Sequence, residues 1–369
     1  MIYTEYGSTG IEVSAIGLGG MRFPDHEDWD RSAAVMKAAY EAGVNYFDTA
    51  PGYGKSEDIF GVALKDMLKT RDEKPFYVAS KTFGADEDSV RRDLENSLKR
   101  MGLDSIDFFH MWCIIHPDAY EKRKGAIKAF EKMRDEGLVK HICVSTHMKG
   151  GEIGDMLRDY PFEGVLLGYS AMNFAYREAG LDAAAELNRG VVVMNPLGGG
   201  LIPRHPDRFD FLKSRADESV VQGALRFLID DPRIDVALVG LDSEEHVREV
   251  VAAVDAYTPL GEADKQRVRS SLKDAFDELC TGCRYCDHCP RGIPVPQYME
   301  SYNHYMLSGK PKAMLNRQRM HWGIKPEDDY LDRCTECGVC EEACTQRLPI
   351  VARLKEIKAE VEKARAAGS

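Results

Sequence analysis

The chain has 369 residues, 44% of them hydrophobic and 30% charged, which is typical of a globular protein with a full apolar core. Its formal net charge of −12 argues against a nucleic-acid partner, because proteins bind the phosphate backbone with basic side chains. The first residues do not resemble a signal peptide and no apolar run is long enough to span a membrane, so we expect a cytoplasmic protein without a membrane segment.

Up to about residue 258, short apolar runs alternate with amphipathic stretches. The apolar runs are typical of buried strands, and they begin at Ala15, Val44, Phe76, Ile106, His141, Val165, Val191 and Val236. The stretches between and after them have helical periodicity, over residues 31–42, 57–68, 89–101, 120–136, 152–159, 183–188, 219–228 and 244–256. Residues 2–14 are expected to form a hairpin that closes the bottom of the resulting fold.

Eight strands alternating with eight helices predict an α/β fold, a (β/α)8 TIM barrel, which typically takes about 250 residues. An open doubly wound sheet is the alternative, but it would usually carry a Gly-x-Gly-x-x-Gly turn after its first strand. The first strand here ends in GLGGM at residues 17–21, which does not match that turn. We therefore expect a barrel over residues 1–258 and a second domain over residues 259–369.

The second domain carries eight of the ten cysteines in two runs, Cys280, Cys283, Cys286 and Cys289, then Cys334, Cys337, Cys340 and Cys344. Three cysteines spaced by two residues let a short backbone surround a [4Fe–4S] cluster. Zinc usually takes two separated pairs of ligands, and disulfides need an oxidising compartment, so both alternatives fit less well. The sequence thus predicts two [4Fe–4S] clusters.

In two-cluster ferredoxins the last cysteine of each run binds the other cluster. We therefore assign one cluster to Cys280, Cys283, Cys286 and Cys344, and the other to Cys334, Cys337, Cys340 and Cys289. Tyr298, Tyr302 and Tyr305 between the runs have helical spacing, and residues 351–367 form a charged amphipathic stretch. These patterns predict a mostly helical ferredoxin-like domain that ends in a helix.

Barrels of this type carry their chemistry where the strands end. Asp48 ends the second strand, Tyr53 follows in the loop, and Lys81 lies near the end of the third strand. A lysine in an apolar strand needs a carboxylate partner, for which Asp48 is the natural candidate. A lysine beside a tyrosine hydroxyl would lower the tyrosine pKa from about 10 and make Tyr53 a general acid. A purely structural ion pair beside a turn tyrosine is the alternative.

Three segments, YGSTGIEVSAIGLG at 6–19, FDTAPGYGKSE at 47–57 and ASKT at 79–82, closely resemble the aldo-keto reductase pattern. With its cysteine runs, the chain resembles the subgroup that carries a C-terminal ferredoxin-like domain. The resemblance covers about residues 1–258. It implies that Tyr53 protonates the substrate oxygen, that Lys81 tunes Tyr53, and that Asp48 anchors Lys81. It also implies that a nicotinamide, bound extended across the barrel mouth, delivers hydride.

The chain departs from this pattern at the fourth family residue, a histidine. Counting from Asp107, its place holds Trp112. His110 lies one pleat deeper on the same face of the strand, where it either replaces the missing donor or is a core histidine. Losing the family histidine removes a donor that polarises a carbonyl oxygen.

The resemblance also assigns a cofactor site, at Gly19, Gly20, Ser145, Thr146, Tyr169, Asn195, Leu197, Gly199 and Glu249. Thr146 stands where the family has Asn, and Tyr169 where it has Gln. Gly240 and His246 replace a Lys and an Arg that often grip the 2′-phosphate, so NADP and NAD both stay open. A flavin is a third candidate, because the loops after strands 7 and 8 of such barrels often bind phosphate.

Nicotinamides transfer two electrons as hydride, whereas iron–sulfur clusters transfer one at a time. Three interpretations follow. The barrel is an NAD(P)H-dependent reductase of a small carbonyl or related substrate, with clusters that are structural or serve a redox partner protein. Alternatively, the clusters feed electrons into the barrel mouth, or the protein is an electron carrier or redox sensor whose barrel has lost hydride transfer.

Overall fold

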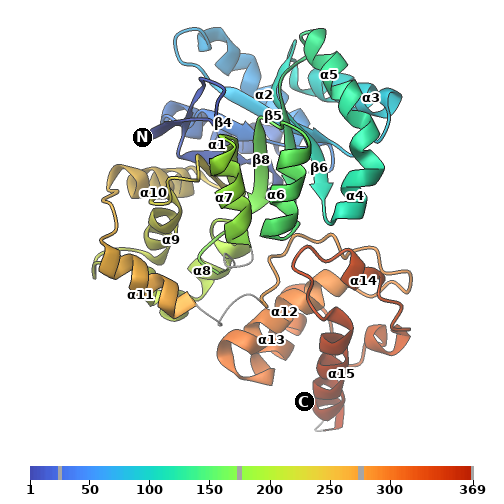
Figure 1. Cartoon of the computed structure of the whole chain (residues 1–369). Coiled ribbons are helices and arrows are strands. Elements are labelled where there is room, and N and C mark those ends of the chain that lie inside the picture. Colours follow the sequence, from blue (N-terminus) through green and yellow to red (C-terminus); the bar gives the residue numbers. More distant parts are fainter. Residues whose placement is uncertain (24–26, 173–176, 273–277, 367–369) are drawn as a thin grey trace. The chain divides into compact units, whose positions relative to one another are not determined.

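A computed structural model describes residues 1–23, 27–172, 177–272 and 278–366 (Figure 1). Contacts divide the chain into two compact units, Met1–Lys273 and Asp274–Ser369. Within the described residues, no helix is long and apolar enough to cross a membrane.

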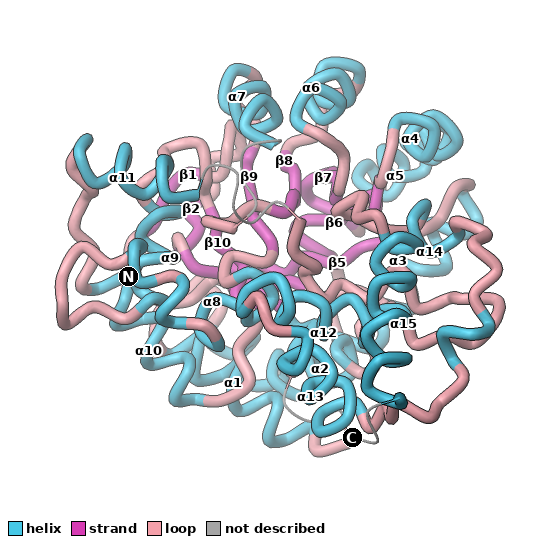
Figure 2. The backbone as a smooth tube through the Cα atoms, turned by 90° about the horizontal axis from the view of Figure 1, so that it is seen from below, coloured by secondary structure: helices cyan, strands magenta, loops and turns pink. Residues whose placement is uncertain are grey.

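The first unit is the predicted barrel. Eight parallel strands close in the order β10-β3-β4-β5-β6-β7-β8-β9, and Figure 2 shows them inside a surrounding layer of helices. The strands are β3 Ile16–Gly19, β4 Tyr46–Asp48, β5 Tyr77–Thr82, β6 Ile106–Ile114, β7 Val139–Thr146, β8 Gly164–Gly168, β9 Gly190–Met194 and β10 Val236–Val239. All eight predicted strands are therefore confirmed.

The helices of this unit are α1 Trp29–Glu41, α2 Ser56–Met67, α3 Glu87–Met101, α4 Pro117–Arg123, α5 Ile127–Asp135, α6 Gly150–Asp159, α7 Glu178–Glu186, α8 Leu201–Arg204, α9 Val220–Ile229, α10 Glu244–Asp255 and α11 Glu262–Leu272. The single helix predicted over 120–136 is wrong. A tighter 3-10 turn, Lys124–Ala126, separates α4 from α5 there, and the Gly125 within it is a poor helix former.

The predicted hairpin closes the barrel bottom. Strands β1 Tyr3–Glu5 and β2 Glu12–Ser14 pair antiparallel, and the fully buried Tyr6 between them packs in the barrel interior with Phe108, ring centres 4.7 Å apart. A Cβ atom on Gly164 or Gly190 would collide with the Tyr6 ring, so these strand positions require glycine. The interior is thus filled from below by side chains.

The first unit extends past residue 258, where the sequence placed its end. Helix α11 lies beyond that position and is tied to the unit by Lys265, whose Nζ is 2.9 Å from Asp230 Oδ2. Arg267 donates hydrogen bonds to the carbonyl oxygens of Phe211 and Lys213. The strand–helix alternation ends before this helix, which explains why sequence pattern alone did not include it.

The second unit is helical, as predicted. It contains α12 Val295–Ser308, α13 Pro311–Trp322, the 3-10 helix η8 Tyr330–Arg333, α14 Val339–Glu342 and α15 Ile350–Ala366. Glu300 on α12 accepts hydrogen bonds from Arg317 and from the Trp322 indole, which ties α12 to α13. The apolar core of this unit includes two of the cysteines, Cys286 and Cys344.

Candidate active site and cysteine sites

Lys81 and Asp48 form an ion pair inside the barrel. Strand alternation places Asp48 on the same face as the interior residue Tyr46, and Lys81 on the same face as Ala79. Lys81 Nζ lies 2.5 Å from Asp48 Oδ1 and donates to the Thr49 carbonyl oxygen at 2.8 Å, with both charged side chains buried. Burial lowers the pKa of Lys81 and raises that of Asp48, and each charge opposes the shift of the other.

The Tyr53 ring lies next to Lys81 of this pair. Lys81 Nζ is 5.1 Å from the centre of the Tyr53 ring, so the structure brings together the three residues expected to form the site. The expectation that Lys81 lowers the Tyr53 pKa is wrong for this structure. Burial raises that pKa well above its ordinary value, and the nearby Asp48 and Cys113 add to the rise. The Tyr53 phenol therefore keeps its proton at neutral pH.

His110 is fully buried in the barrel interior, paired in register with Lys81 on the neighbouring strand. Its Nδ1 lies 3.3 Å from the Ser80 carbonyl oxygen, while Nε2 has no hydrogen-bond partner among the described residues. Burial, reinforced by the charge of Lys81, lowers the pKa of His110 to about 3. A neutral imidazole with one unused nitrogen thus lies next to the ion pair.

Trp112 occupies the place expected for the family histidine and contacts Tyr53. The two rings meet edge to face with centres 5.5 Å apart, and Phe83 stacks on Trp112 at 4.1 Å. Strand β6 is irregular here, because its register with β7 shifts between Met111 and Ile114 and Cys113 has a φ of 57°. Such a bulge re-aims a side chain, and here it accompanies an aromatic wall beside Tyr53.

Of the predicted cofactor residues Ser145, Thr146 and Tyr169, only part is directed into the barrel. Ser145 shares the inward face of Cys143 and is buried. The Thr146 hydroxyl instead donates to the Ile114 carbonyl oxygen at 2.8 Å and accepts from the Met148 N–H. Tyr169 donates to Glu178 Oε1 at 2.7 Å. The structure therefore brings only Ser145 of these three to the interior.

The remaining predicted cofactor residues lie at the ends of the strands or on a nearby helix. Gly19 ends β3, and Gly20 follows it in a position where a Cβ atom would collide with Ser56 on α2. Asn195 and Gly199 have positive φ values of 59° and 65° in the loop after β9, which also contains Leu197, and Glu249 is exposed on α10. Packing accounts for Gly20, whereas the turns after β9 are closed by their own backbone, with the Gly198 N–H donating to the Asn195 carbonyl oxygen and the Gly200 N–H to the Leu197 carbonyl oxygen.

Sequence reasoning missed Arg22. This exposed side chain follows β3, and its aliphatic part packs on Gly240, where a Cβ atom would lie 2.7 Å from Arg22 Cγ. Its charge acts on Tyr53 and partly offsets the rise of the Tyr53 pKa. The signal available in the sequence was a basic residue three positions after the end of β3, the first strand of the barrel.

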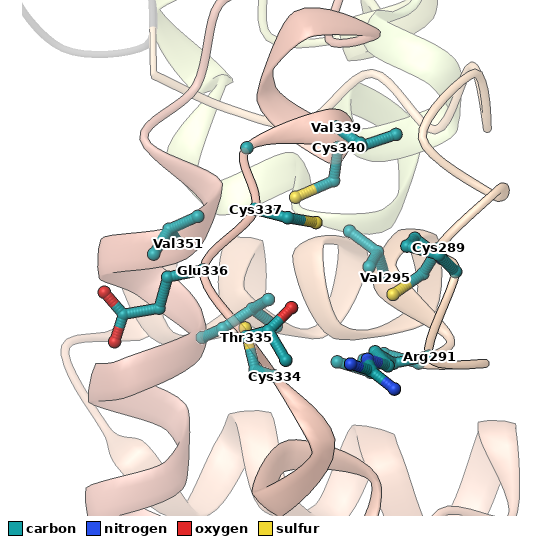
Figure 3. Close-up of a pocket in the computed structure, with 14 residues that line it drawn as sticks. Cys289, Arg291, Val295, Cys334, Thr335, Glu336, Cys337, Val339, Cys340 and Val351 are labelled. Carbon is teal, nitrogen blue, oxygen red and sulfur yellow. The ribbon is translucent and has the colours of Figure 1, made fainter.

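The eight predicted ligands gather in two groups that cross between the runs. Cys289 lines one pocket with Cys334, Cys337 and Cys340, and Figure 3 shows their sulfur atoms turned toward the same space. Cys344 lies in the other group, where burial and then the thiols of Cys283 and Cys344 raise the pKa of Cys280 to about 12. Burial likewise raises the pKa of Cys340 to about 11, with Cys289 contributing.

The cysteines of these groups are the donor type that a [4Fe–4S] cluster takes, with one thiolate on each of four irons. Four cysteines line the pocket of Cys289, Cys334, Cys337 and Cys340, so this donor set fits a [4Fe–4S] cluster.

Comparison with known proteins gives two matches along the chain. The pattern of the aldo/keto reductase family matches residues 15–273, and that of a 4Fe-4S dicluster domain matches residues 279–348. The chain is 28% identical over 292 residues to L-galactose dehydrogenase of Arabidopsis thaliana, covering 69% of this chain and 88% of the relative. It is 26% identical over 327 residues to aldo-keto reductase YhdN of Bacillus subtilis, covering 75% and 96%.

A solved structure has the same barrel fold. Aldo-keto reductase AKR11C1 from Bacillus halodurans, in its holo form, superposes with a TM-score of 0.64 at 24% identity. The match covers 74% of this chain and 97% of that one.

Proposed function

We propose, from the premise that this chain belongs to the aldo/keto reductase family and carries a 4Fe-4S dicluster domain, that it is an NAD(P)H-dependent oxidoreductase with Tyr53 as proton donor. Its substrate would be a small carbonyl compound or a related molecule. The observation that carries the proposal is the buried Lys81–Asp48 pair whose lysine Nζ lies 5.1 Å from the centre of the Tyr53 ring.

Each residue of this set has a distinct role in proton transfer. Tyr53 holds a proton at its hydroxyl and gives it to the substrate oxygen as charge develops there. Lys81 stabilises the phenolate that results, and Asp48 holds Lys81 in place in the barrel interior. Because the Tyr53 pKa is raised, proton release depends on the negative charge that the reaction itself creates on the substrate.

A bound nicotinamide supplies the hydride. We propose that Ser145 and the backbone of the loop containing Asn195, Leu197 and Gly199 hold this cofactor, with Gly19 and Glu249 at its edges. Thr146 and Tyr169 are committed to other hydrogen bonds, so their predicted cofactor roles require a rearrangement. Trp112 and Phe83 would then form an apolar wall that keeps water from the reacting atoms.

The second unit would hold two [4Fe–4S] clusters with crossed ligands. The pocket formed by Cys289 with Cys334, Cys337 and Cys340 supports one set, and the grouping of Cys344 with the first run supports the other. These clusters would be structural or would exchange single electrons with a redox partner protein.

A second function is favoured by Trp112, which replaces the expected carbonyl-polarising histidine. In this alternative the protein is an iron–sulfur electron carrier or redox sensor whose barrel binds a flavin or a substrate without ordinary hydride transfer. Its neutral His110 would then be a structural core residue.

Anaerobic purification followed by iron, sulfide and cofactor analysis, then titration with NADPH and NADH, separates these functions. The proposed enzyme contains eight irons per chain on the assumption of two four-iron clusters, and it changes the fluorescence of at least one nicotinamide on binding. EPR spectra before and after the addition then report whether electrons reach the clusters. If neither nicotinamide binds, or if a flavin copurifies, the reductase proposal fails and the alternative is supported.

A further inference from the structure

Both cysteine runs begin with the dipeptide Cys-Thr, but the two threonines differ in their environment. Thr335, after Cys334, is exposed. Thr281, after Cys280, is only 5% exposed, and its hydroxyl oxygen has no hydrogen-bond partner among the described residues. The chain therefore contains a matched pair of threonines, one exposed at the pocket of the second run and one buried next to a predicted cluster ligand.

A buried hydroxyl without a partner destabilises the fold, and such groups are rare in folded proteins. Where one lies next to the ligand of a bound group, that group is the natural acceptor. Sulfur atoms of an iron–sulfur cluster accept hydrogen bonds from the protein, and these bonds help to set the reduction potential.

The backbone that leads into Thr281 is fixed by side chains from two helices. Asn303 on α12 is fully buried; its Oδ1 accepts from the Cys280 N–H at 2.8 Å, and its Nδ2 donates to the Cys280 carbonyl oxygen at 2.7 Å. The buried Arg353 on α15 donates to the Glu278 carbonyl oxygen at 2.7 Å. Two helices therefore hold the segment that leads into Thr281.

We propose that the Thr281 hydroxyl donates a hydrogen bond to a sulfur of the cluster held by Cys280, Cys283, Cys286 and Cys344. This inference rests on the proposed function in one respect, the presence of two clusters with crossed ligands. A donor near the sulfurs stabilises the cluster more after it gains an electron, because its negative charge is then larger. Thr281 therefore raises the reduction potential of this cluster, whereas the exposed Thr335 has no comparable effect on the other.

The test is an EPR-monitored dithionite titration of the anaerobic full-length protein, in which each cluster accepts one electron without making or breaking a covalent bond. Thr281→Val removes the hydroxyl and keeps the shape of the side chain. Thr335→Val makes the same substitution at the exposed threonine. We expect Thr281→Val to change the ratio of reduced to oxidised cluster about tenfold toward the oxidised form at a fixed potential, which corresponds to about 59 mV for one electron. Only one of the two reduction steps should shift, and Thr335→Val should shift neither.

Thr281→Ser is the rescue variant, because it retains a hydroxyl at the same position. It should keep the wild-type midpoint, which a role limited to packing would not predict. Suppose that the wild-type protein holds its full iron and sulfide. If the midpoints of Thr281→Val then equal those of the wild type, the inference is overturned. Equal shifts in the Thr281 and Thr335 variants would overturn it as well. Wild-type protein without clusters would instead refute the proposed function, so the two failures are distinguishable. If Thr281→Val loses iron, Thr281→Ala is titrated in its place, and an unchanged midpoint there contradicts the inference.

Discussion

The barrel and the second unit differ in where their functional side chains lie relative to the apolar core. In the barrel, an apolar core lies between strands and helices and a second one fills the interior, so Lys81, Asp48 and His110 are additions to a core that other residues supply. In the second unit, Cys286 and Cys344 belong to the apolar core, and other cysteines pack against it. A site residue of the barrel can therefore be changed without removing part of its apolar core, whereas changing Cys286 or Cys344 also changes the core of the second unit.

The largest effect that this comparison predicts is at Cys344. Cys344→Ala should lose the cluster shared with the first run, about half of the bound iron, and expose residues 274–369 to proteolysis, because ligand binding and folding are coupled in small metal domains. Iron analysis and limited proteolysis measure the two changes. Cys143→Ala, in the barrel interior, is the control and should retain all the iron. Full iron content in Cys344→Ala would refute the crossed assignment.

The next effect concerns the buried ion pair of the barrel. Lys81→Met leaves Asp48 buried without its partner and should reduce the free energy of unfolding by about 3–5 kcal/mol. Adding Asp48→Asn should recover much of that loss, since no buried charge then remains. Urea unfolding followed by circular dichroism measures both. Lys37→Met breaks an exposed pair with Asp66, which water screens, and should change the free energy of unfolding much less than Lys81→Met. An equal loss of unfolding free energy in Lys81→Met and Lys37→Met would contradict the expectation that burial makes the Lys81–Asp48 pair more important for stability.

A smaller effect is expected in the pH dependence of stability. The pKa of His110 is about 3 in the folded barrel and about 6.5 when unfolded, so the unfolded chain binds a proton between these values and the folded barrel does not. The contribution of the neutral His110 imidazole to the free energy of unfolding is fully present above pH 6.5 and is lost as the pH falls toward 3. This loss is at most about 1.4 kcal/mol per pH unit.

His110→Gln removes this contribution, so the difference in unfolding free energy between wild type and variant should shrink as the pH falls from 6.5 to 4.5. Comparing wild type with the variant cancels the contributions of other titratable groups to this pH dependence. One of them is Asp235: burial raises its pKa to about 7, and its contribution has the opposite sign. A difference that is constant across this range would mean that His110 is not buried in its neutral form.

The sequence predicted the barrel well because its strands are apolar and its helices are periodic, and both patterns are local. The pairing of Lys81 with Asp48 could also be predicted, since charged residues near the ends of neighbouring parallel strands must meet. Features that depend on residues distant in the sequence could not be predicted. The bulge at Cys113, the hydrogen bond from Tyr169 to Glu178 and the burial of Thr281 depend on tertiary packing.

The raised pKa of Tyr53 illustrates the same limit. The sequence placed a lysine near this tyrosine and therefore suggested a lowered pKa. The structure adds burial, and it shows that the charge of Asp48, already expected beside Lys81, also acts on Tyr53; both raise its pKa. The sign of the shift depends on the sum of these effects, which a motif does not contain.

The central claim is that Tyr53 supplies the proton in a hydride-transfer reaction, and Tyr53→Phe tests it most directly. Anaerobic single-turnover oxidation of bound NADPH by a panel of aldehydes and ketones should slow by about 100-fold or more in this variant. The affinity for NADPH should stay unchanged, and the exposed Tyr3→Phe should behave as wild type. Wild-type rates in Tyr53→Phe would contradict the account.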